Sequence, residues 1–189
     1  ADCVRASRDV LLRPGAAGNV HDRASLCFVG RQIAALLGGD LIENPPEDHP
    51  ADAYWLPAGT LSAAEIHELG IASEQDFYGG AVPHGFVATK AVSHALVAPG
   101  ATAPPGWSRE AAIARWVLDG ITVFSLDDAA IAGAALLADG PVRVKQVGAS
   151  AGVGQYVAAD FAKLAQVLAD QDPATVAREG LVVEQNLLD

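Results

Sequence analysis

Apolar residues recur along the first half of the chain with two periods, those of strands and of helices. Residues 9–13, DVLLR, form a short apolar run that predicts a strand. Apolar residues recur at helical spacing across 21–40, which predicts a helix with Asp22 as N-cap and Gly38-Gly39 at its end. A polar, proline-rich connection follows, and 53–57, AYWLP, predicts a short buried strand.

A second helix is predicted from a local capping pattern. In SAAE, residues 62–65, the Ser62 hydroxyl can accept an orphan N–H while Glu65 reaches back, which is a capping box. We expect this helix to run to Gly70. The next segment, 79–97, carries strand-like residues and a Gly-Gly turn, and we expect a helix from Thr89.

The second half alternates helices and strands more regularly. Helices are predicted over 108–120, 125–140 and 160–170, the last capped by Asp160, and Asp172-Pro173 begins another turn. Strands are predicted at the segments between and after them, which are 121–125, 142–147, 155–160 and 181–188. This alternation places the fold between α/β and α+β. The loop-rich junction around 79–106 predicts two units, an N-terminal α/β domain over 1–88 and a second over 89–189.

Composition limits the classes of function. The chain of 189 residues has a hydrophobic fraction of 51% and a net charge of -11. An acidic chain is unsuited to nucleic acid, so we expect no nucleic-acid partner. The same charge repels free nucleotides, so any phosphate site must be locally positive.

Targeting and membrane segments are not predicted. No apolar run approaches the roughly 18 residues of a membrane span, and the charged N-terminus lacks the apolar core of a signal peptide. We therefore expect a cytoplasmic protein without a membrane partner. Because the chain contains no methionine, we expect its start to be processed or the chain to be part of something longer.

A glycine loop joins two predicted strands, with Lys145 on the strand that enters it. The loop, GASAGVG, has glycines at Gly148, Gly152 and Gly154. It lacks the Gly-Lys-Ser/Thr of a Walker loop and the helix that follows a dinucleotide fingerprint. Two interpretations stay open from these residues alone. One is a flap whose backbone N–H groups and lysine hold a triphosphate, and the other is a hairpin with a flexible tip and an exposed lysine.

The order of these elements resembles the ATP-grasp family. In that family, a lysine-bearing strand and a glycine flap cover the phosphates of ATP, and a later strand with a Glu-x-x-Leu pattern contacts adenine. The resemblance implies that Lys145 and the loop, Gly148, Ser150, Gly152 and Gly154 included, cover the phosphates. It also implies that Glu184 and Leu187 contact adenine, and VATKAV supplies the family's earlier lysine as Lys90. The implied cofactor is ATP, a small-molecule nucleotide, with magnesium.

A narrower resemblance covers nearly the whole chain. The segments LPAGTLSAAEIHELGI, FYGGAVPHGFVATKAVSHALV and APPGWS are similar to an uncharacterised bacterial family that has itself been likened to ATP-grasp proteins. It implies a pre-ATP-grasp-like piece followed by the first ATP-grasp subdomain. The chain departs from the ATP-grasp pattern at Gln146, where proline is common, and at Ala149 to Ala151, where glycine is usual. It also stops at Asp189, before the subdomain that binds magnesium, so we expect no metal ligands in this chain.

Histidines and cysteines point to no other site. The five histidines are far apart, without zinc-ligand spacing, and His84 is expected to be part of a structural turn. Cys3 and Cys27 give no disulfide framework. Catalytic residues and oligomeric state are not predicted.

Two functions remain after the sequence is considered. In the first, the chain is part of an ATP-dependent ligase that joins a carboxylate to an amine or a thiol. We then expect the chain by itself to bind ATP at most weakly and not to turn it over. The alternative is a degenerate scaffold that binds a nucleotide or a protein partner without catalysis. The diluted glycine loop favours the second function.

Overall fold

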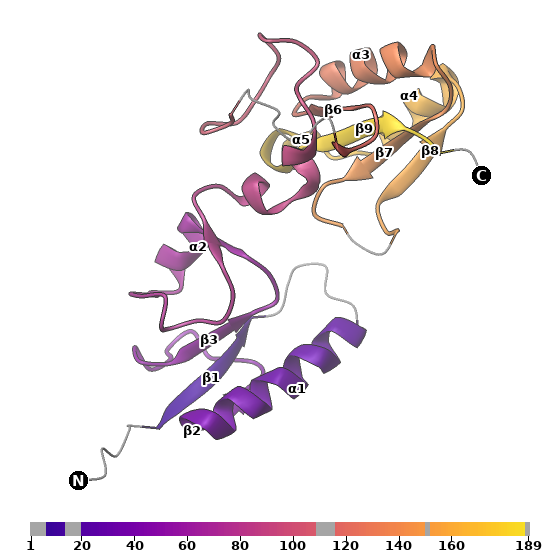
Figure 1. Cartoon of the computed structure of the whole chain (residues 1–189). Helices are drawn as coiled ribbons and strands as arrows, with labels where there is room; N and C mark the ends of the chain where they lie inside the picture. Colours follow the sequence, from indigo (N-terminus) through magenta and orange to yellow (C-terminus); the bar gives the residue numbers. More distant parts are fainter. Residues whose placement is uncertain (1–6, 14–19, 109–115, 150–151, 188–189) are drawn as a thin grey trace. The chain divides into compact units, whose positions relative to one another are not determined.

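The protein is described by a computed structural model that covers residues 7–13, 20–108, 116–149 and 152–187. The chain divides into two compact units, one up to Pro83 and the other from His84 onward (Figure 1). The sequence places the boundary at residue 88, within the same junction.

The first unit is built on a parallel sheet of three strands, in the order β2-β1-β3. The strands are β1 (Arg8–Arg13), β2 (Gly38–Ile42) and β3 (Tyr54–Pro57), and the long helix α1 (Val20–Leu37) joins the first two. The predicted strands and helix are confirmed, but Asp22 is wrong as N-cap because the helix begins at Val20. The sequence analysis also missed β2, which begins at Gly38, directly after the helix; the φ of Gly38 is 73°.

Each face of this sheet packs against a different helix. Alternation in β1 sends Val10 and Leu12 toward α1, where they pack with Cys27, Ala34 and Leu56. It sends Leu11 to the opposite face, where a second core contains Ala53, Trp55, Leu61, Leu69 and Phe77. The short helix α2 (Ala63–Glu68) covers this second core and carries the predicted capping box of Ser62 and Glu65. The small strands β4 (Leu61–Ser62) and β5 (Ala81–Val82) pair beside it.

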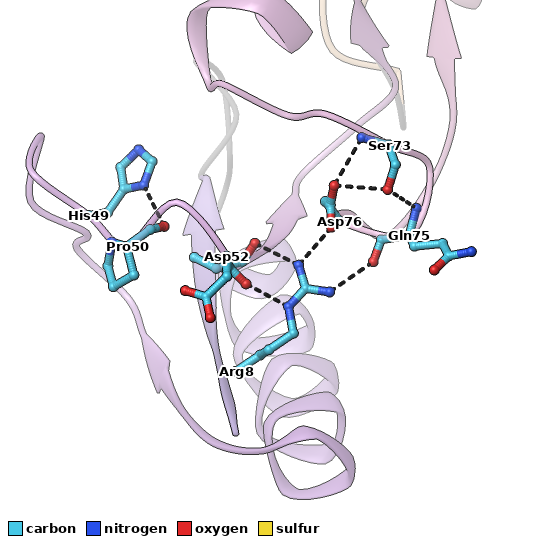
Figure 2. Close-up of polar contacts among 8 residues, drawn as sticks. Arg8, His49, Pro50, Asp52, Ser73, Gln75 and Asp76 are labelled. Atoms are coloured by element: carbon cyan, nitrogen blue, oxygen red, sulfur yellow. Dashed lines mark hydrogen bonds and ion pairs between the residues drawn. The ribbon is translucent and has the colours of Figure 1, made fainter. Parts of the chain in front are cut away.

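Arg8 braces two loops of the first unit against each other (Figure 2). Its guanidinium donates to the carbonyls of Asp52 at 2.6 Å and Ala53 at 3.1 Å, and to the Gln75 carbonyl at 3.3 Å. It also forms an ion pair of 2.9 Å with Asp76. Both loops are therefore fixed by one side chain that starts on β1.

The second unit contains an antiparallel sheet of four strands, in the order β6-β9-β7-β8. The elements are β6 (Gly120–Val123), α3 (Leu126–Leu137), β7 (Val142–Gln146), β8 (Gln155–Ala158), α4 (Phe161–Ala169), α5 (Pro173–Glu179) and β9 (Leu181–Gln185). Their order and types confirm the prediction for 121–188, and Asp160 and Asp172 cap α4 and α5 as expected. The helix predicted over 108–120 falls mainly on 109–115, outside the described residues.

The helix predicted from Thr89 is wrong. The segment instead forms two short 3-10 turns, η1 (Gly85–Ala88) and η2 (Lys90–Ser93), separated by extended Thr89. The Thr89 side chain accepts the Ala91 N–H at 3.1 Å and so competes with a continuous helix.

The two faces of this sheet differ in what covers them. Val142, Val144, Leu181 and Val183 pack in one core with Leu164 of α4 and with Ala129 and Ala132 of α3. The opposite face is covered by the 85–97 segment and an aromatic cluster of Phe86, Trp107 and Phe124. Side chains that alternate away from α3 and α4 therefore point toward the 85–97 segment and the aromatic cluster.

We expect Gly39→Ala to lower the free energy of unfolding by about 2 kcal/mol, within the usual range for overpacking. An added Cβ at Gly39 would come within 2.1 Å of the Arg8 carbonyl oxygen, so β1 and β2 would have to separate. A Cβ at Gly59 would meet nothing within 4 Å, so Gly59→Ala should stay within about 0.5 kcal/mol of the original. Urea denaturation of both variants checks this, and equal midpoints would contradict the close approach of β2 to β1.

Candidate functional site

Strand register places charged side chains from β7 and β9 on one face of the second sheet. Arg143 pairs with Glu184, and Lys145 pairs with Val182. Because alternate residues of a strand share a face, Arg143, Lys145 and Glu184 all project away from α3 and α4. Lys145 and Glu184 are diagonal neighbours across the two strands, and their side chains form an ion pair.

Glu184 is a buried carboxylate with two partners. One oxygen faces the Lys145 ammonium, and the other lies 3.7 Å from Nε2 of His94, which is itself only 3% exposed. Burial alone would raise the pKa of Glu184, but the adjacent His94 and Lys145 side chains outweigh it and lower the pKa below its ordinary value. The carboxylate therefore stays ionised at neutral pH.

Gly120 makes room for this contact. It pairs with Glu184 across β6 and β9, and an added Cβ would lie 2.8 Å from Nε2 of His94 and 2.9 Å from Cβ of Glu184. Thr122 then holds the segment that carries His94, because its hydroxyl donates to the Ala91 carbonyl at 2.6 Å and its N–H donates to the Ala95 carbonyl at 2.9 Å. A glycine and a threonine on one strand thus position the histidine.

Lys90 approaches the same face from η2. Its backbone N–H donates to the Val147 carbonyl at 3.4 Å, and its ammonium donates to the Ala149 carbonyl in the glycine loop. Burial lowers the pKa of Lys90 from its ordinary value of 10.5, the nearby Lys145 cation lowers it further, and Glu184 partly opposes both. The two ammonium groups are therefore close enough to repel each other.

The glycine loop leaves β7 in a tight turn. Gln146 N–H donates to the Gly154 carbonyl at 2.8 Å, and Ala149 N–H donates back to the Gln146 carbonyl at 3.3 Å. Gly152 and Gly154 have φ values of 80° and 64°, in the left-handed region that favours glycine. An added Cβ at Gly148 would meet nothing within 4 Å, and Ser150 lies outside the described residues.

The fold therefore brings together three of the residues that the sequence singles out, Lys90, Lys145 and Glu184. Leu187 follows β9 and is 68% exposed. Sequence analysis missed His94, which no local pattern marks, and Arg143, which the alternation of VRVK places on the same face as Lys145. His84 stacks on Phe86 and packs against Gly106, as expected of a structural turn.

The described residues contain neither a metal-binding cluster nor a membrane-spanning helix. No group of three or more histidine, cysteine or acidic residues in that part of the chain could hold a metal ion. None of its helices combines the length and the apolar character that a membrane crossing needs.

Comparisons with known proteins gave one family and two similar structures. The model of a family described as "Protein of unknown function (DUF3182)" matches residues 12–189, and a search of curated proteins found no match. A crystal structure of D-alanyl-alanine synthetase A from Vibrio cholerae is 11% identical with a TM-score of 0.49, over 97% of this chain and 60% of that one. A RimK domain protein ATP-grasp from Sphaerobacter thermophilus is 14% identical with a TM-score of 0.43, over 95% of this chain and 64% of that one. The chain thus spans less than two thirds of either structure.

We expect Glu184→Gln to lower the free energy of unfolding at neutral pH by about 3 kcal/mol at most, the low end for a broken buried ion pair, because Lys145 can still reach water. The pKa of Glu184 is lowered in the folded state. Its contribution is therefore present above the ordinary carboxylate pKa and is lost as pH falls through the folded pKa. The difference from the original should shrink in acid.

Glu179→Gln is the matched control, because Glu179 forms an exposed ion pair with Arg178, a type that contributes at most about 1 kcal/mol. Urea denaturation of both variants across pH provides the measurement. If Glu184→Gln and Glu179→Gln lowered the free energy of unfolding equally at neutral pH, the ion pair between Lys145 and Glu184 would not stabilise the fold.

Proposed function

The chain belongs to the family of proteins of unknown function DUF3182, and we propose that its second unit binds the triphosphate of ATP through Lys90, Lys145 and the glycine loop. The observation that carries this proposal is the convergence of two lysines from distant segments beside one buried carboxylate. Their charges are close enough for Lys145 to lower the pKa of Lys90.

Electrostatics support a phosphate ligand at this face. The protein as a whole has a net charge of -11, which disfavours the approach of an anion. On this face, however, three cations, Lys90, Lys145 and Arg143, lie around the carboxylate of Glu184. Two partly buried ammonium groups that repel each other gain stability when an anion lies between them. A triphosphate supplies several acceptor oxygens for both.

The remaining predicted residues complete the proposed site. Gly148, Ser150, Gly152 and Gly154 belong to the loop that would cover the phosphates, and Glu184 and Leu187 lie at the end of β9 where the base would bind. The described residues offer no set of protein ligands for the magnesium that accompanies ATP in enzymes. The proposal therefore concerns how the nucleotide is held.

The activity that we propose for the whole protein is ATP-dependent ligation of a carboxylate to an amine or a thiol. Such a reaction needs a triphosphate held in position and neutralised as the phosphoryl group moves. Lys90 and Lys145 would hold phosphate oxygens, and the loop would cover the β and γ phosphates. Phosphate release with magnesium and a panel of carboxylates and amines tests this activity.

One observation favours a second candidate, a nucleotide-binding scaffold without turnover. Both ammonium groups already have protein acceptors, since Lys90 donates to the Ala149 carbonyl and Lys145 pairs with Glu184. A site satisfied in this way can remain folded without ligand. In the whole protein, steady phosphate release that disappears in Lys145→Ala would favour the ligase, whereas ATP binding without release would favour the scaffold.

We expect Lys145→Ala to weaken ATP binding by about tenfold or more, which corresponds to one lost hydrogen bond between charged groups. Lys163→Ala is the matched control, because Lys163 is an exposed lysine on α4, on the side of the sheet away from the site. Calorimetric titration with ATP measures both. Equal affinities for the two variants, or no ATP binding by the unmodified chain, would refute the proposed site.

Lys90 makes the proposed binding dependent on pH. Because its pKa lies below the ordinary 10.5, Lys90 loses its charge at a lower pH than a solvated lysine does. ATP affinity should therefore begin to fall at a pH below 10.5 and fall further as pH rises through the lowered pKa. Lys90→Arg should bind ATP with little change over the same range, since arginine keeps its proton. Identical pH profiles for the two proteins would exclude Lys90 as a phosphate ligand.

A further inference from the structure

Arg143 lies on the same face of the sheet as Lys145, two residues earlier along β7. Residues two apart on a strand are separated by about 7 Å. On the neighbouring strands, Arg143 pairs with Glu184 of β9 and with Val157 of β8. The arginine therefore occupies the middle of the sheet, next to the proposed phosphate lysine.

Two neutral amides fix the plane of the Arg143 guanidinium. Its Nε and Nη2 donate to Oδ1 of Asn186 at 3.0 and 2.8 Å. On the other side, its Nη1 donates to Oε1 of Gln155 at 3.0 Å. All guanidinium donors point within the plane of the group, so these bonds hold its edges and leave its two flat faces without a hydrogen bond.

In the part of the chain that the structure describes, the charge of Arg143 has no carboxylate partner. No ion pair within 4.0 Å involves it among the described residues, although Glu184 is opposite in the register. Two apolar residues that are neighbours of Arg143 or of its partner Asn186 are also exposed to solvent. Val157, its partner on β8, is 43% exposed, and Leu187, which follows Asn186, is 68% exposed. A flat cation bordered by uncovered apolar groups matches the surface of an aromatic ring, which is apolar with a negative face.

We propose that the Arg143 guanidinium is the platform on which the base of the bound nucleotide stacks. This inference rests on the proposed function, because Lys145 must hold the phosphates for the base to reach Arg143. Guanidinium planes stack on nucleobases, and the ammonium of a lysine does not replace that contact. The separation of about 7 Å along the strand leaves room for the ribose between phosphate and base. Arg143 thereby selects a nucleoside triphosphate over an inorganic polyphosphate.

The test compares ATP with inorganic tripolyphosphate, which has the phosphates but no base. Arg143→Lys keeps the positive charge and removes the planar group. We expect it to weaken ATP binding by about tenfold, as for one lost stacking contact, and to leave tripolyphosphate binding within about twofold. Arg178→Lys, at an exposed arginine of α5, should change neither. Calorimetric titrations of the full chain give all the affinities.

A second variant leaves the arginine in place. Asn186→Ala removes one acceptor that fixes the guanidinium, so it should weaken ATP binding by a smaller factor and again spare tripolyphosphate. Equal losses for both ligands in Arg143→Lys would show that Arg143 acts only as a phosphate charge and would overturn the inference. Unchanged ATP binding in both variants would show that Arg143 only braces the strands. If the unmodified chain binds neither ligand, the proposed function itself fails.

Discussion

The second unit depends on one buried carboxylate, Glu184. An ionised carboxylate inside a protein is costly unless charges and hydrogen bonds compensate it. Lys145 compensates it from the neighbouring strand, and the ring of His94, on the 85–97 segment, lies 3.7 Å from its second oxygen. The His94 contact in turn requires a residue without a side chain at Gly120. Three residues on three separate segments, Lys145, His94 and Gly120, are therefore constrained by a single charge.

The two faces of the second sheet differ in composition: one is apolar and the other carries charged side chains. The face toward α3 and α4 buries valines and leucines almost completely and supplies the hydrophobic stabilisation of the unit. The opposite face carries Glu184, Lys145 and Arg143, whose burial costs free energy unless each is paired. The dry core offsets that cost, so the polar face can hold charged groups in fixed positions.

The ion pair between Lys145 and Glu184 is compatible with the proposed binding of phosphate. A lysine ammonium has three donors, so Lys145 can keep Glu184 and still donate to a phosphate oxygen. Lys90 has the same capacity beside the Ala149 carbonyl. Glu184 would then hold Lys145 in place for the nucleotide, while the partners of Arg143 among the described residues are the amides of Asn186 and Gln155.

Much of the local structure was determined by the sequence alone. The capping box at Ser62, the caps at Asp160 and Asp172 and the alternation of β7 each depend on residues a few positions apart, and each prediction is confirmed. Two local predictions failed: the helix expected to be capped at Asp22 begins at Val20, and the segment after Thr89 forms a short 3-10 turn whose Ala91 N–H donates to the Thr89 hydroxyl.

The tertiary structure decided which side chains meet. Lys90, Lys145 and Glu184 were predicted from a family resemblance, and their assignment to ATP stays a prediction. Nothing within a few residues of His94 or Gly120 reveals their contact with Glu184, because it depends on how β6 and β9 pair. The bond from Arg143 to Asn186 joins residues 43 positions apart. Strand register fixes such contacts, and register is set by the packing of the whole sheet rather than by any one strand.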